Sequence, residues 1–313
     1  MLTLYDFHES TFTAARPLFV ACGVFDGVHR GHQALLAKAR ILADAAGGRA
    51  VALSFNPHPL AVLCPEHAPA MIATVPMRLR LLSAAGLGGC VMLNFNRAMS
   101  EMAPEDFFTF ILEKLPHIQG FVVGEDWRFG CRQSGDAALL SDLAARRKRE
   151  AVIVPPVIHD GRKISSTRIR AALRAGDLDL AQTLLGRPFG ICGIVQHGRQ
   201  IGRTLGVPTA NLLPGGKNPV PPGSYAARVI LNDTPHPASV YCGSRPTYQD
   251  SPGEYYVEAH LLDGSYNLYG QEITVELLRF LRPETKFPDE AALRAGIRND
   301  LEMAKTFFRK TVP

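Results

Sequence analysis

Residues 18–32 read L-F-V-A-C-G-V-F-D-G-V-H-R-G-H, and this stretch decides how the first half of the chain folds. Its opening run, residues 18–22, is apolar and of strand length, and a helical pattern begins at residue 33. Three glycines separate the strand from the helix: Gly23, Gly27 and Gly31. Glycine tolerates positive φ and lets a ligand approach the backbone closely. We therefore expect a tight turn that leads into a helix N-terminus, where N–H groups and the helix dipole attract anions.

Two histidines follow this turn. His29 and His32 lie three residues apart, so they share a face if the helix has already begun. Two imidazoles, backbone amides and a helix dipole would together bind phosphate oxygens. Asp26 stands so near in sequence that we expect it to orient the loop or a ribose. The alternative is a glycine-rich turn with two surface histidines, and the flanking strand and helix favour the functional interpretation.

The composition is that of an ordinary globular protein. The chain has 313 residues, of which 46% are hydrophobic and 20% charged, and this length suits two domains with separate cores. The net charge of +5 suits anionic substrates but does not indicate nucleic-acid binding. The R-R-K-R run at residues 146–149 is best explained as the end of a solvated helix.

The cysteines and the first residues predict where the protein works. Six cysteines are scattered without a C-x-x-C pair, which is typical of a reducing compartment and makes a zinc or redox site unexpected. The sequence has no signal-peptide pattern and no apolar run long enough to span a membrane. We therefore expect a cytoplasmic protein with small-molecule substrates and with no nucleic-acid or membrane partner. The sequence leaves the oligomeric state open.

The first half alternates short apolar runs with helical patterns. The runs predict buried strands at residues 18–22, 50–55, 90–93, 121–123 and 152–154. The intervening patterns predict helices at residues 33–46, 75–85, 104–115 and 135–149. This alternation predicts an α/β fold with a Rossmann-like, doubly wound parallel sheet, in which ligands gather beyond the carboxyl ends of the strands.

Two of the expected strands run into unusual loops. After the second strand, residues 56–59 present His58 between two prolines, which make the turn rigid. After the fourth, residues 124–130 read G-E-D-W-R-F-G and set Trp127 and Phe129 on either side of a cation. Such an aromatic pair suits a flat ring system, although the same side chains could pack into the core.

Residues 164–170, I-S-S-T-R-I-R, open another helix. Hydroxyl groups at a helix N-terminus cap the helix and can also donate to phosphate, as can the planar guanidinium of Arg168. As a plain cap this stretch would carry little information. In one chain with the histidine turn, it indicates a site for nucleotide phosphates.

A second domain begins near residue 186, after a helical region at 171–185 with a break at 176–177. Strand-like runs at residues 189–197, 224–231, 238–242, 255–262 and 272–281 predict a small antiparallel β-barrel. The amphipathic pattern at 290–309 predicts a C-terminal helix that packs against the barrel. We therefore expect domains at residues 1–185 and 186–313.

Glycines are frequent in residues 186–211, which suits a mobile backbone that folds over a phosphate, although turns between strands would also explain them. The segment is not a P-loop, because Lys217 is followed by Asn rather than by Ser or Thr. In residues 256–260, Y-V-E-A-H, strand alternation puts Glu258 and His260 on one face. Taken alone, Glu258 would be a solvated surface carboxylate.

These motifs, in this order, resemble those of bacterial bifunctional riboflavin kinase/FAD synthetases. Residues 23–32, G-x-F-D-G-x-H-x-G-H, are similar to the signature of the HxGH nucleotidyltransferases, and residues 202–211, G-R-x-L-G-x-P-T-A-N, to the hallmark of riboflavin kinases. The resemblance covers about residues 15–305. It implies that ATP phosphorylates riboflavin to FMN in the barrel, and that a second ATP adenylylates FMN to FAD in the N-terminal domain, with Mg²⁺ in both steps.

The resemblance also implies residue roles. For adenylyl transfer it implies catalytic His29 and His32, and an ATP site made of Gly23, Phe25, Asp26, Gly31, Ser165, Ser166, Thr167 and Arg168. It implies that the flavin of that step contacts Asn56, Pro57, His58, Asp126, Trp127 and Phe129. In the kinase domain it implies a catalytic base, Glu258, and an ATP site made of Gly198, Gly202, Arg203, Gly206, Pro208, Thr209 and Asn211. Of these, Thr209 and Asn211 would ligate Mg²⁺.

The chain departs from the family pattern at a few positions. Asn56 stands where the family often has Glu, Trp127 where it usually has Phe, and Tyr241-Cys242 where Asn-Ile is common before a glycine. None of these departures touches Thr209, Asn211 or Glu258.

Three other interpretations stay open at this point. The first is an enzyme with only one intact site, and the second is a flavin-binding regulator that has lost turnover. The third is a nucleotidyltransferase for another phosphorylated substrate, with the barrel as an accessory module. Intact motifs in both halves argue against the first, and Glu258 beside a P-T-A-N segment disfavours the third.

Overall fold

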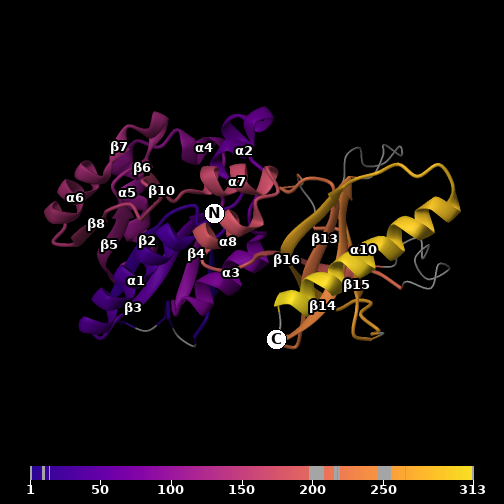
Figure 1. The fold of residues 1–313 in the computed structure, drawn as a ribbon. Helices are drawn as coiled ribbons and strands as arrows, with labels where there is room; N and C mark the ends of the chain where they lie inside the picture. Colours follow the sequence, from indigo (N-terminus) through magenta and orange to yellow (C-terminus); the bar gives the residue numbers. More distant parts are fainter. Residues whose placement is uncertain are drawn as a thin grey trace. The chain divides into compact units, whose positions relative to one another are not determined.

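The computed structural model describes residues 2–8, 11–13, 15–196, 208–214, 217, 219–244, 255–264 and 266–311. The chain divides into two compact units (Figure 1). The first comprises Met1–Pro69 and Val75–Ser165, and the second comprises Ala70–Thr74 and Ser166–Pro313. Each unit is built around a sheet of its own, an open one in the first and a closed barrel in the second.

The first unit contains a six-stranded sheet with the strand order β1-β4-β3-β2-β5-β8. Its strands are β1 (Leu2–Asp6), β2 (Leu18–Cys22), β3 (Arg49–Phe55), β4 (Gly89–Leu93), β5 (Ile118–Gly124) and β8 (Glu150–Val154). The strands from β2 to β8 pair in parallel, which confirms the expected architecture. At one edge β1 pairs with β4 in the antiparallel direction. Strand β1 was not predicted from the sequence, because its side chains are exposed or half-buried and show no apolar run.

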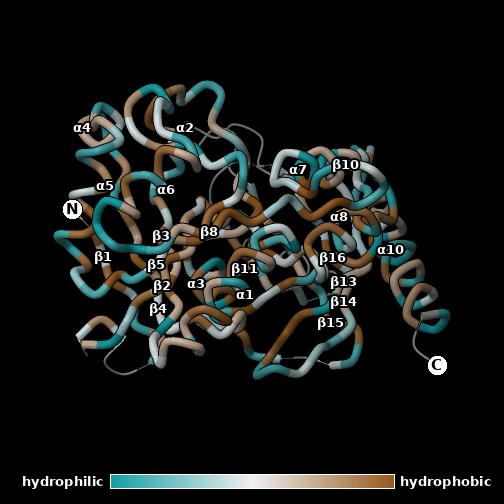
Figure 2. Tube along the Cα trace, turned by 90° about the vertical axis from the view of Figure 1, so that its left-hand side faces the viewer, coloured by the Kyte–Doolittle hydropathy of each residue, from teal (hydrophilic) through white to brown (hydrophobic). Residues whose placement is uncertain are grey.

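Helices cover both faces of this sheet. They are α1 (Arg30–Ala45), α3 (Val75–Ala84), α5 (Pro104–Lys114) and α6 (Ala137–Arg146), with the short helices α2 (Pro59–Leu63) and α4 (Arg97–Ser100). In β2, Phe19 and Ala21 share a core with α1 and α3, whereas Leu18 and Val20 share a core with α5 and α6. Because both faces are covered, the central strands are hydrophobic along most of their length (Figure 2).

The strand order reverses at β2. The chain passes through β2, β3 and β4 toward one edge, and then returns to place β5 on the other side of β2. In doubly wound sheets ligands bind at such a switch point, beyond the carboxyl ends of the strands. The segments that follow β3, β2 and β5 contain three of the sequence motifs, so three neighbouring strands deliver them to the same edge.

Small elements complete the first unit. They are η1 (Pro65–His67), β6 (Arg128–Phe129), η2 (Cys131–Gln133), β7 (Gly135–Asp136), β9 (Ile158–His159) and β10 (Arg162–Lys163). They also explain why one helix begins later than expected. Asp136 belongs to β7 and caps α6, with its Oδ1 accepting a hydrogen bond from the Leu139 amide at 2.9 Å.

The second unit is a closed antiparallel barrel with the strand order β11-β12-β15-β14-β13-β16. Its strands are β11 (Phe189–Gln196), β12 (Ala210–Leu212), β13 (Gly223–Leu231), β14 (Thr234–Ser244), β15 (Tyr255–Leu261) and β16 (Glu272–Pro283). Pairing of β11 with β16 closes the barrel. The expected barrel is therefore confirmed, and only the three-residue strand β12 escaped the sequence pattern.

The helices that the structure describes in the second unit are α7 (Ser166–Arg174), α8 (Leu178–Leu185) and α10 (Glu290–Thr311). The last of these is the expected C-terminal helix, and it packs on β13, β14 and β16 (Figure 1). Asp300 of α10 is buried and accepts two hydrogen bonds from Arg282, at 2.6 and 2.7 Å, and one from the Ser224 hydroxyl at 2.7 Å. A bidentate ion pair therefore fastens α10 to the barrel.

Helices α7 and α8 belong to the same unit as the barrel. Asp179 of α8 forms an ion pair with Arg279 of β16 at 3.2 Å, and Gly176 between the two helices lies against Phe280. The expected domains, residues 1–185 and 186–313, stay a prediction.

Within the described residues, no helix is both long enough and apolar enough to cross a membrane. The six cysteines are all described, and they form no disulfide. Burial raises the pKa of the thiols of Cys22, Cys90 and Cys242 to about 12, so these three behave as small core residues.

Candidate functional site

The turn after β2 is strained and buried. Phe25 and Val28 have φ angles of +53° and +41°, in the left-handed region that bulky and β-branched residues rarely adopt. Their exposed fractions are 0% and 2%, and the neighbouring Asp26 is buried as well. Backbone strain of this kind persists only where surrounding contacts hold it, and it gathers at functional sites. The turn is therefore a candidate for a functional loop.

The two histidines of the motif lie together where α1 begins. Their rings are stacked, with 3.6 Å between centroids and 15° between planes. We expected a shared helical face if the helix had already begun at His29. The helix begins only at Arg30, so His29 is its N-cap instead. The Nδ1 atom of His29 accepts a hydrogen bond from the His32 amide at 3.2 Å. An accepting nitrogen carries no proton, so a neutral His29 holds its proton on Nε2 and donates from there.

His32 is half-buried, and the Phe25 ring meets it edge-on at 5.2 Å between centroids. Its Nδ1 is buried and has no hydrogen-bond partner among the described residues. Burial lowers the pKa of His32 well below its usual value, and the nearby His29, Lys163 and Arg78 lower it further. His32 is therefore neutral at pH 7. A phosphate bound beside it would raise its pKa, because an opposite charge favours the protonated ring.

Two cations of this region were not predicted from the sequence. Arg78 of α3 is only 1% exposed, and its Nη1 donates to the Val24 carbonyl oxygen at 2.7 Å. Lys163 of β10 forms an ion pair with Asp126. Helical arginines are usually exposed, so no sequence signal marks Arg78. Lys163 directly precedes the I-S-S-T-R-I-R motif, and this position was a signal that could have found it.

The start of the I-S-S-T-R-I-R motif lies beside Gly31, at the beginning of α1. A Cβ at Gly31 would lie 3.1 Å from the His29 ring and 3.4 Å from the carbonyl oxygen of Ile164. Gly23 is similarly confined, since its Cβ would lie 3.1 Å from the Phe25 ring. Ser165 ends the first unit. The remaining motif residues, Ser166, Thr167 and Arg168, open α7 of the second unit, so their approach to the histidines stays a prediction.

The first segment expected at the flavin follows β3. Asn56 and Pro57 are exposed, and His58 is half-buried. His58 caps α2, with its Nδ1 accepting a hydrogen bond from the Leu60 amide at 3.1 Å. This bond fixes the ring that the two prolines were expected to present.

The second flavin segment follows β5. Trp127 is half-buried and stacks on Phe129, with 6.5 Å between centroids and 18° between planes. Phe129 is 6% exposed and packs into the core, 6.0 Å from Phe107, so it supports Trp127 from behind. Asp126 is exposed, and its carboxylate is held by Lys163.

The expected kinase residues lie on neighbouring barrel strands. Asn211 of β12 is paired with Glu258 of β15, which is also paired with Tyr241 of β14. These three residues are half-buried. Burial alternates along β15, so Glu258 and His260 share the outer face of the barrel, as predicted. A carboxylate is thereby held next to the P-T-A-N segment.

The P-T-A-N segment presents oxygen atoms. The Asn211 amide nitrogen donates to the Thr209 carbonyl oxygen at 3.3 Å, which orients the amide and points its oxygen the other way. The Pro208 carbonyl oxygen lies 2.8 Å from Nδ1 of His260, which must donate because a carbonyl only accepts. Hydroxyl and amide oxygens of this kind suit Mg²⁺. The other expected residues, Gly198, Gly202, Arg203 and Gly206, lie outside the described residues.

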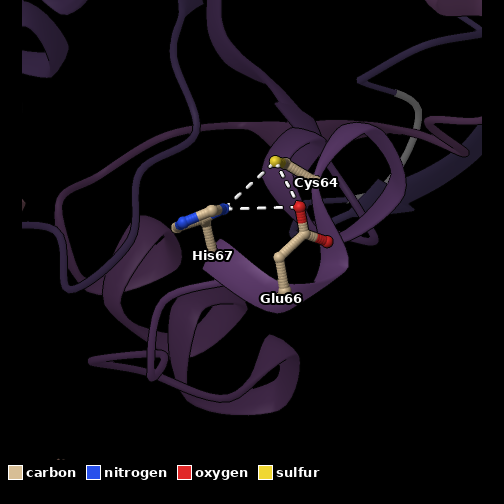
Figure 3. A group of neighbouring side chains, drawn as sticks. All are labelled: Cys64, Glu66 and His67. Atoms are coloured by element: carbon tan, nitrogen blue, oxygen red, sulfur yellow. Dashed lines mark hydrogen bonds and ion pairs between the residues drawn. The ribbon is translucent and has the colours of Figure 1, made fainter.

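One further group of side chains contains metal-ligand types. Cys64, Glu66 and His67 lie around one short turn (Figure 3), with the Cys64 thiol 2.9 Å from the Glu66 carboxylate and 3.2 Å from the His67 ring. Glu66 and His67 are exposed. The thiol donates to Glu66, which raises the pKa of Cys64, whereas a metal binds the thiolate. Hydrogen bonds within one turn explain this group without a metal.

Comparisons with known proteins match both halves of the chain. The FAD synthetase family model matches residues 12–168, and the riboflavin kinase family model matches residues 185–308. A bifunctional riboflavin kinase/FMN adenylyltransferase of Escherichia coli (strain K12) is 36% identical over 93% of both chains. Proteins of the same name are 36% identical in Pseudomonas fluorescens, over 90% of both chains, and in Haemophilus influenzae, over 91% of this chain and 92% of the relative.

A solved structure has a similar fold. The crystal structure titled macrolide-efflux protein from Streptococcus pneumoniae has a TM-score of 0.79 and 29% sequence identity. The match covers 96% of this chain and 97% of that one, so the likeness includes both the α/β unit and the barrel unit.

Proposed function

This chain belongs to the family of bifunctional riboflavin kinase/FMN adenylyltransferases, and we propose from its geometry which residues carry each reaction. As a riboflavin kinase it uses ATP to phosphorylate riboflavin to FMN. As an FMN adenylyltransferase it transfers the adenylyl group of a second ATP to FMN, which gives FAD and releases pyrophosphate.

In our proposal the N-terminal domain binds the triphosphate of ATP where α1 begins. The observation that carries this proposal is the stacked, largely buried imidazole pair of His29 and His32, at the end of β2 and within the electrostatic reach of Lys163. The FMN phosphate attacks the α-phosphorus of ATP, and pyrophosphate leaves. The two imidazoles, Lys163 and Arg168 stabilise the negative charge of the leaving pyrophosphate. No covalent enzyme intermediate is needed, so catalysis consists of positioning and charge stabilisation.

The remaining contacts of the adenylyl site follow from the same proposal. Gly23 and Gly31 keep the backbone accessible, and Asp26 orients the turn from its buried position. The hydroxyl groups of residues 165–167 donate to phosphate oxygens. The isoalloxazine ring lies on Trp127, which Phe129 supports from behind, and Asp126 and the segment Asn56, Pro57 and His58 lie around the ring.

For the kinase reaction we assign the base to Glu258. Its carboxylate accepts the proton of the riboflavin 5′-hydroxyl as the γ-phosphoryl group arrives. Thr209 and Asn211 hold Mg²⁺, which would neutralise charge on the nucleotide phosphates when bound. The hydrogen bond from His260 to the Pro208 carbonyl keeps these ligands beside Glu258. The glycine-rich segment with Gly198, Gly202, Arg203 and Gly206 covers the phosphates in this proposal.

One incubation tests the assignment of both activities to this chain. Pure protein is mixed with riboflavin, ATP and Mg²⁺, and the flavins are separated by chromatography. FMN followed by FAD is the expected result, and chelation of Mg²⁺ should stop both steps. FMN without FAD would indicate a protein with one working site, and tight flavin binding without ATP consumption would indicate a regulator.

The same proposal covers the setting of the reaction. The substrates are riboflavin, FMN and ATP, with no nucleic-acid or membrane partner. We propose that the protein works in the cytoplasm, where buried thiols such as those of Cys22 and Cys90 stay reduced. The adenylyltransferase occupies residues 1–185 and the kinase residues 186–313.

A further inference from the structure

A strained turn needs contacts that hold it, and the turn after β2 is held at one atom. The Val24 carbonyl oxygen accepts two hydrogen bonds, one from Nη1 of Arg78 at 2.7 Å and one from the Ser54 hydroxyl at 2.8 Å. The two donors also contact each other, with 3.3 Å between Nη1 and Oγ. The left-handed residue Phe25 follows Val24 directly, so this contact restrains the turn just before its first strained position.

The donor from α3 is an unusual choice for such a contact. Arg78 is 1% exposed, and the negative charge of Asp26, which is equally buried, acts on its guanidinium. Its Nε is buried and has no hydrogen-bond partner among the same residues. A buried cation costs free energy, whereas a neutral donor such as Ser54 already satisfies the carbonyl. A hydrogen bond to Val24 alone would not require this charge.

The position of Arg78 suggests a use for this charge. From Val24 the turn continues to Phe25, whose ring packs edge-on against His32, and His32 stacks on His29. The guanidinium is also one of the charges that keep the pKa of His32 low. The same contact reaches β3 through Ser54, two residues before Asn56. One side chain thus connects the strand that leads to the flavin segment with the turn that leads to the histidines.

We propose that Arg78 is a positioning residue for adenylyl transfer, whose buried guanidinium holds the Val24 carbonyl and so keeps the turn and its imidazole pair ready for the triphosphate. The positive charge adds attraction for that anion, since charges act strongly where water is excluded. This inference rests on the proposed roles of His29 and His32.

The test compares three variants with a matched control. Arg78→Met removes the charge and all donors at similar length, Arg78→Lys keeps the charge, and Ser54→Ala removes only the second donor to Val24. Leu82→Ala is the control, because Leu82 is 0% exposed on the same helix and faces the core shared with α1. For each variant we would measure thermal unfolding, the kcat and the KM for ATP with supplied FMN, and riboflavin phosphorylation.

We expect Arg78→Met to lower kcat for FAD formation by roughly 10- to 100-fold, the scale of a small misplacement of reacting groups, and to raise the KM for ATP. Arg78→Lys should restore most of the activity, and Ser54→Ala should show a smaller loss of the same kind. Leu82→Ala should lower the melting temperature without changing kcat. Riboflavin phosphorylation should be unchanged in all four, which provides an internal reference in every preparation.

Two results would overturn the inference. One is wild-type kcat and KM for ATP in Arg78→Met. The other is a kcat loss in Leu82→Ala that matches Arg78→Met at equal loss of melting temperature. If Arg78→Met does not fold, Ser54→Ala decides, and wild-type kcat and KM for ATP in that variant would contradict the inference. A wild-type protein that forms no FAD, or full activity in His32→Ala, would instead refute the proposed function itself.

Discussion

The two candidate sites of this chain are built in opposite ways. Where α1 begins, the functional side chains lie on or beside a turn with left-handed Phe25 and Val28, and a buried arginine holds that turn from behind. On the barrel, Asn211 and Glu258 lie on regular strands, and the pairing of β12 with β15 alone makes them neighbours. One site depends on distant contacts that hold strain, and the other depends on strand register.

The two sites are therefore sensitive to different kinds of substitution. A strained turn relaxes when its supporting contacts are removed, even if every residue of the motif stays. A site on paired strands tolerates changes in the core but not a slip of register, because a slip of one residue turns its side chains to the other face. We therefore expect variants at the two sites to lose the two activities independently, and the first two predictions below test this separation.

The largest effect is expected at Glu258. Glu258→Gln keeps the shape of the side chain and removes the base, so phosphorylation of riboflavin should fall on the order of 10²- to 10⁴-fold. Conversion of supplied FMN to FAD should not change. The matched control is Glu276→Gln, which alters a carboxylate that pairs with Arg228 on the same barrel. Steady-state assays of both steps measure this, and a variant with normal FMN production would remove Glu258 from the mechanism.

The next effect is a loss of FAD formation with riboflavin phosphorylation unchanged, the reverse of the effect at Glu258. His32→Ala should lower kcat for FAD formation on the order of 10²- to 10³-fold, because a donor to the transition state is lost. Riboflavin phosphorylation should stay at the wild-type rate. His67→Ala, which removes an exposed histidine of the same unit, is the control. FAD formation within a few-fold of the wild-type rate in His32→Ala would show that the stacked pair is not the site.

A smaller effect concerns stability. Asp300→Ala leaves Arg282 without its carboxylate at an ion pair whose side chains are 20% and 10% exposed, so unfolding of the barrel unit should become easier by about 3 kcal/mol. Arg279→Ala removes an exposed ion pair with Asp179 and should cost less than about 1 kcal/mol. Urea unfolding measures both. A loss of stability in Asp300→Ala no larger than that in Arg279→Ala would contradict this ranking.

The smallest effect is a dependence on pH. The folded state holds the pKa of His32 below the unfolded value of about 6.5, so the unfolded state binds more protons as the pH falls through that value. Stability should therefore be constant above about pH 7 and decline below it, by at most about 1.4 kcal/mol per pH unit from this group. His32→Gln should flatten the decline in urea unfolding series. An identical slope in both proteins would show that His32 does not carry this dependence.

The strands, helices and motif order could be predicted because each rests on local patterns. Leu18–Cys22 is apolar throughout since both faces of β2 are covered, and the barrel strands follow turns rich in Pro, Gly and Asn. The strands β1 and β12 escaped, because β1 lies at an edge with exposed side chains and β12 has only three residues. A short or half-exposed strand has no periodicity long enough to detect.

The residue roles at the two candidate sites stay a prediction, whereas the local geometry of these residues could not be predicted from the sequence. Spacing suggested that His29 and His32 share a helical face, whereas His29 is the N-cap and its ring stacks on His32. The aromatic pair after β5 is divided between a half-buried Trp127 and a Phe129 packed into the core. The first residue of a helix depends on its capping side chain, and a shift of that start by one residue changes which side chains lie next to one another.

The fold class, the two motif-bearing halves and the identity of the groups that could do the chemistry follow from local sequence, because hydrophobic period and glycine placement act within a few residues. Only the tertiary structure decided which distant groups surround them. Arg78 reaches Val24 across 54 positions, and Asn211 meets Glu258 across a strand pair. Burial and strand register arise from the whole fold. The neutral state of His32 and the position of Arg78 therefore cannot be predicted from any short stretch of the chain.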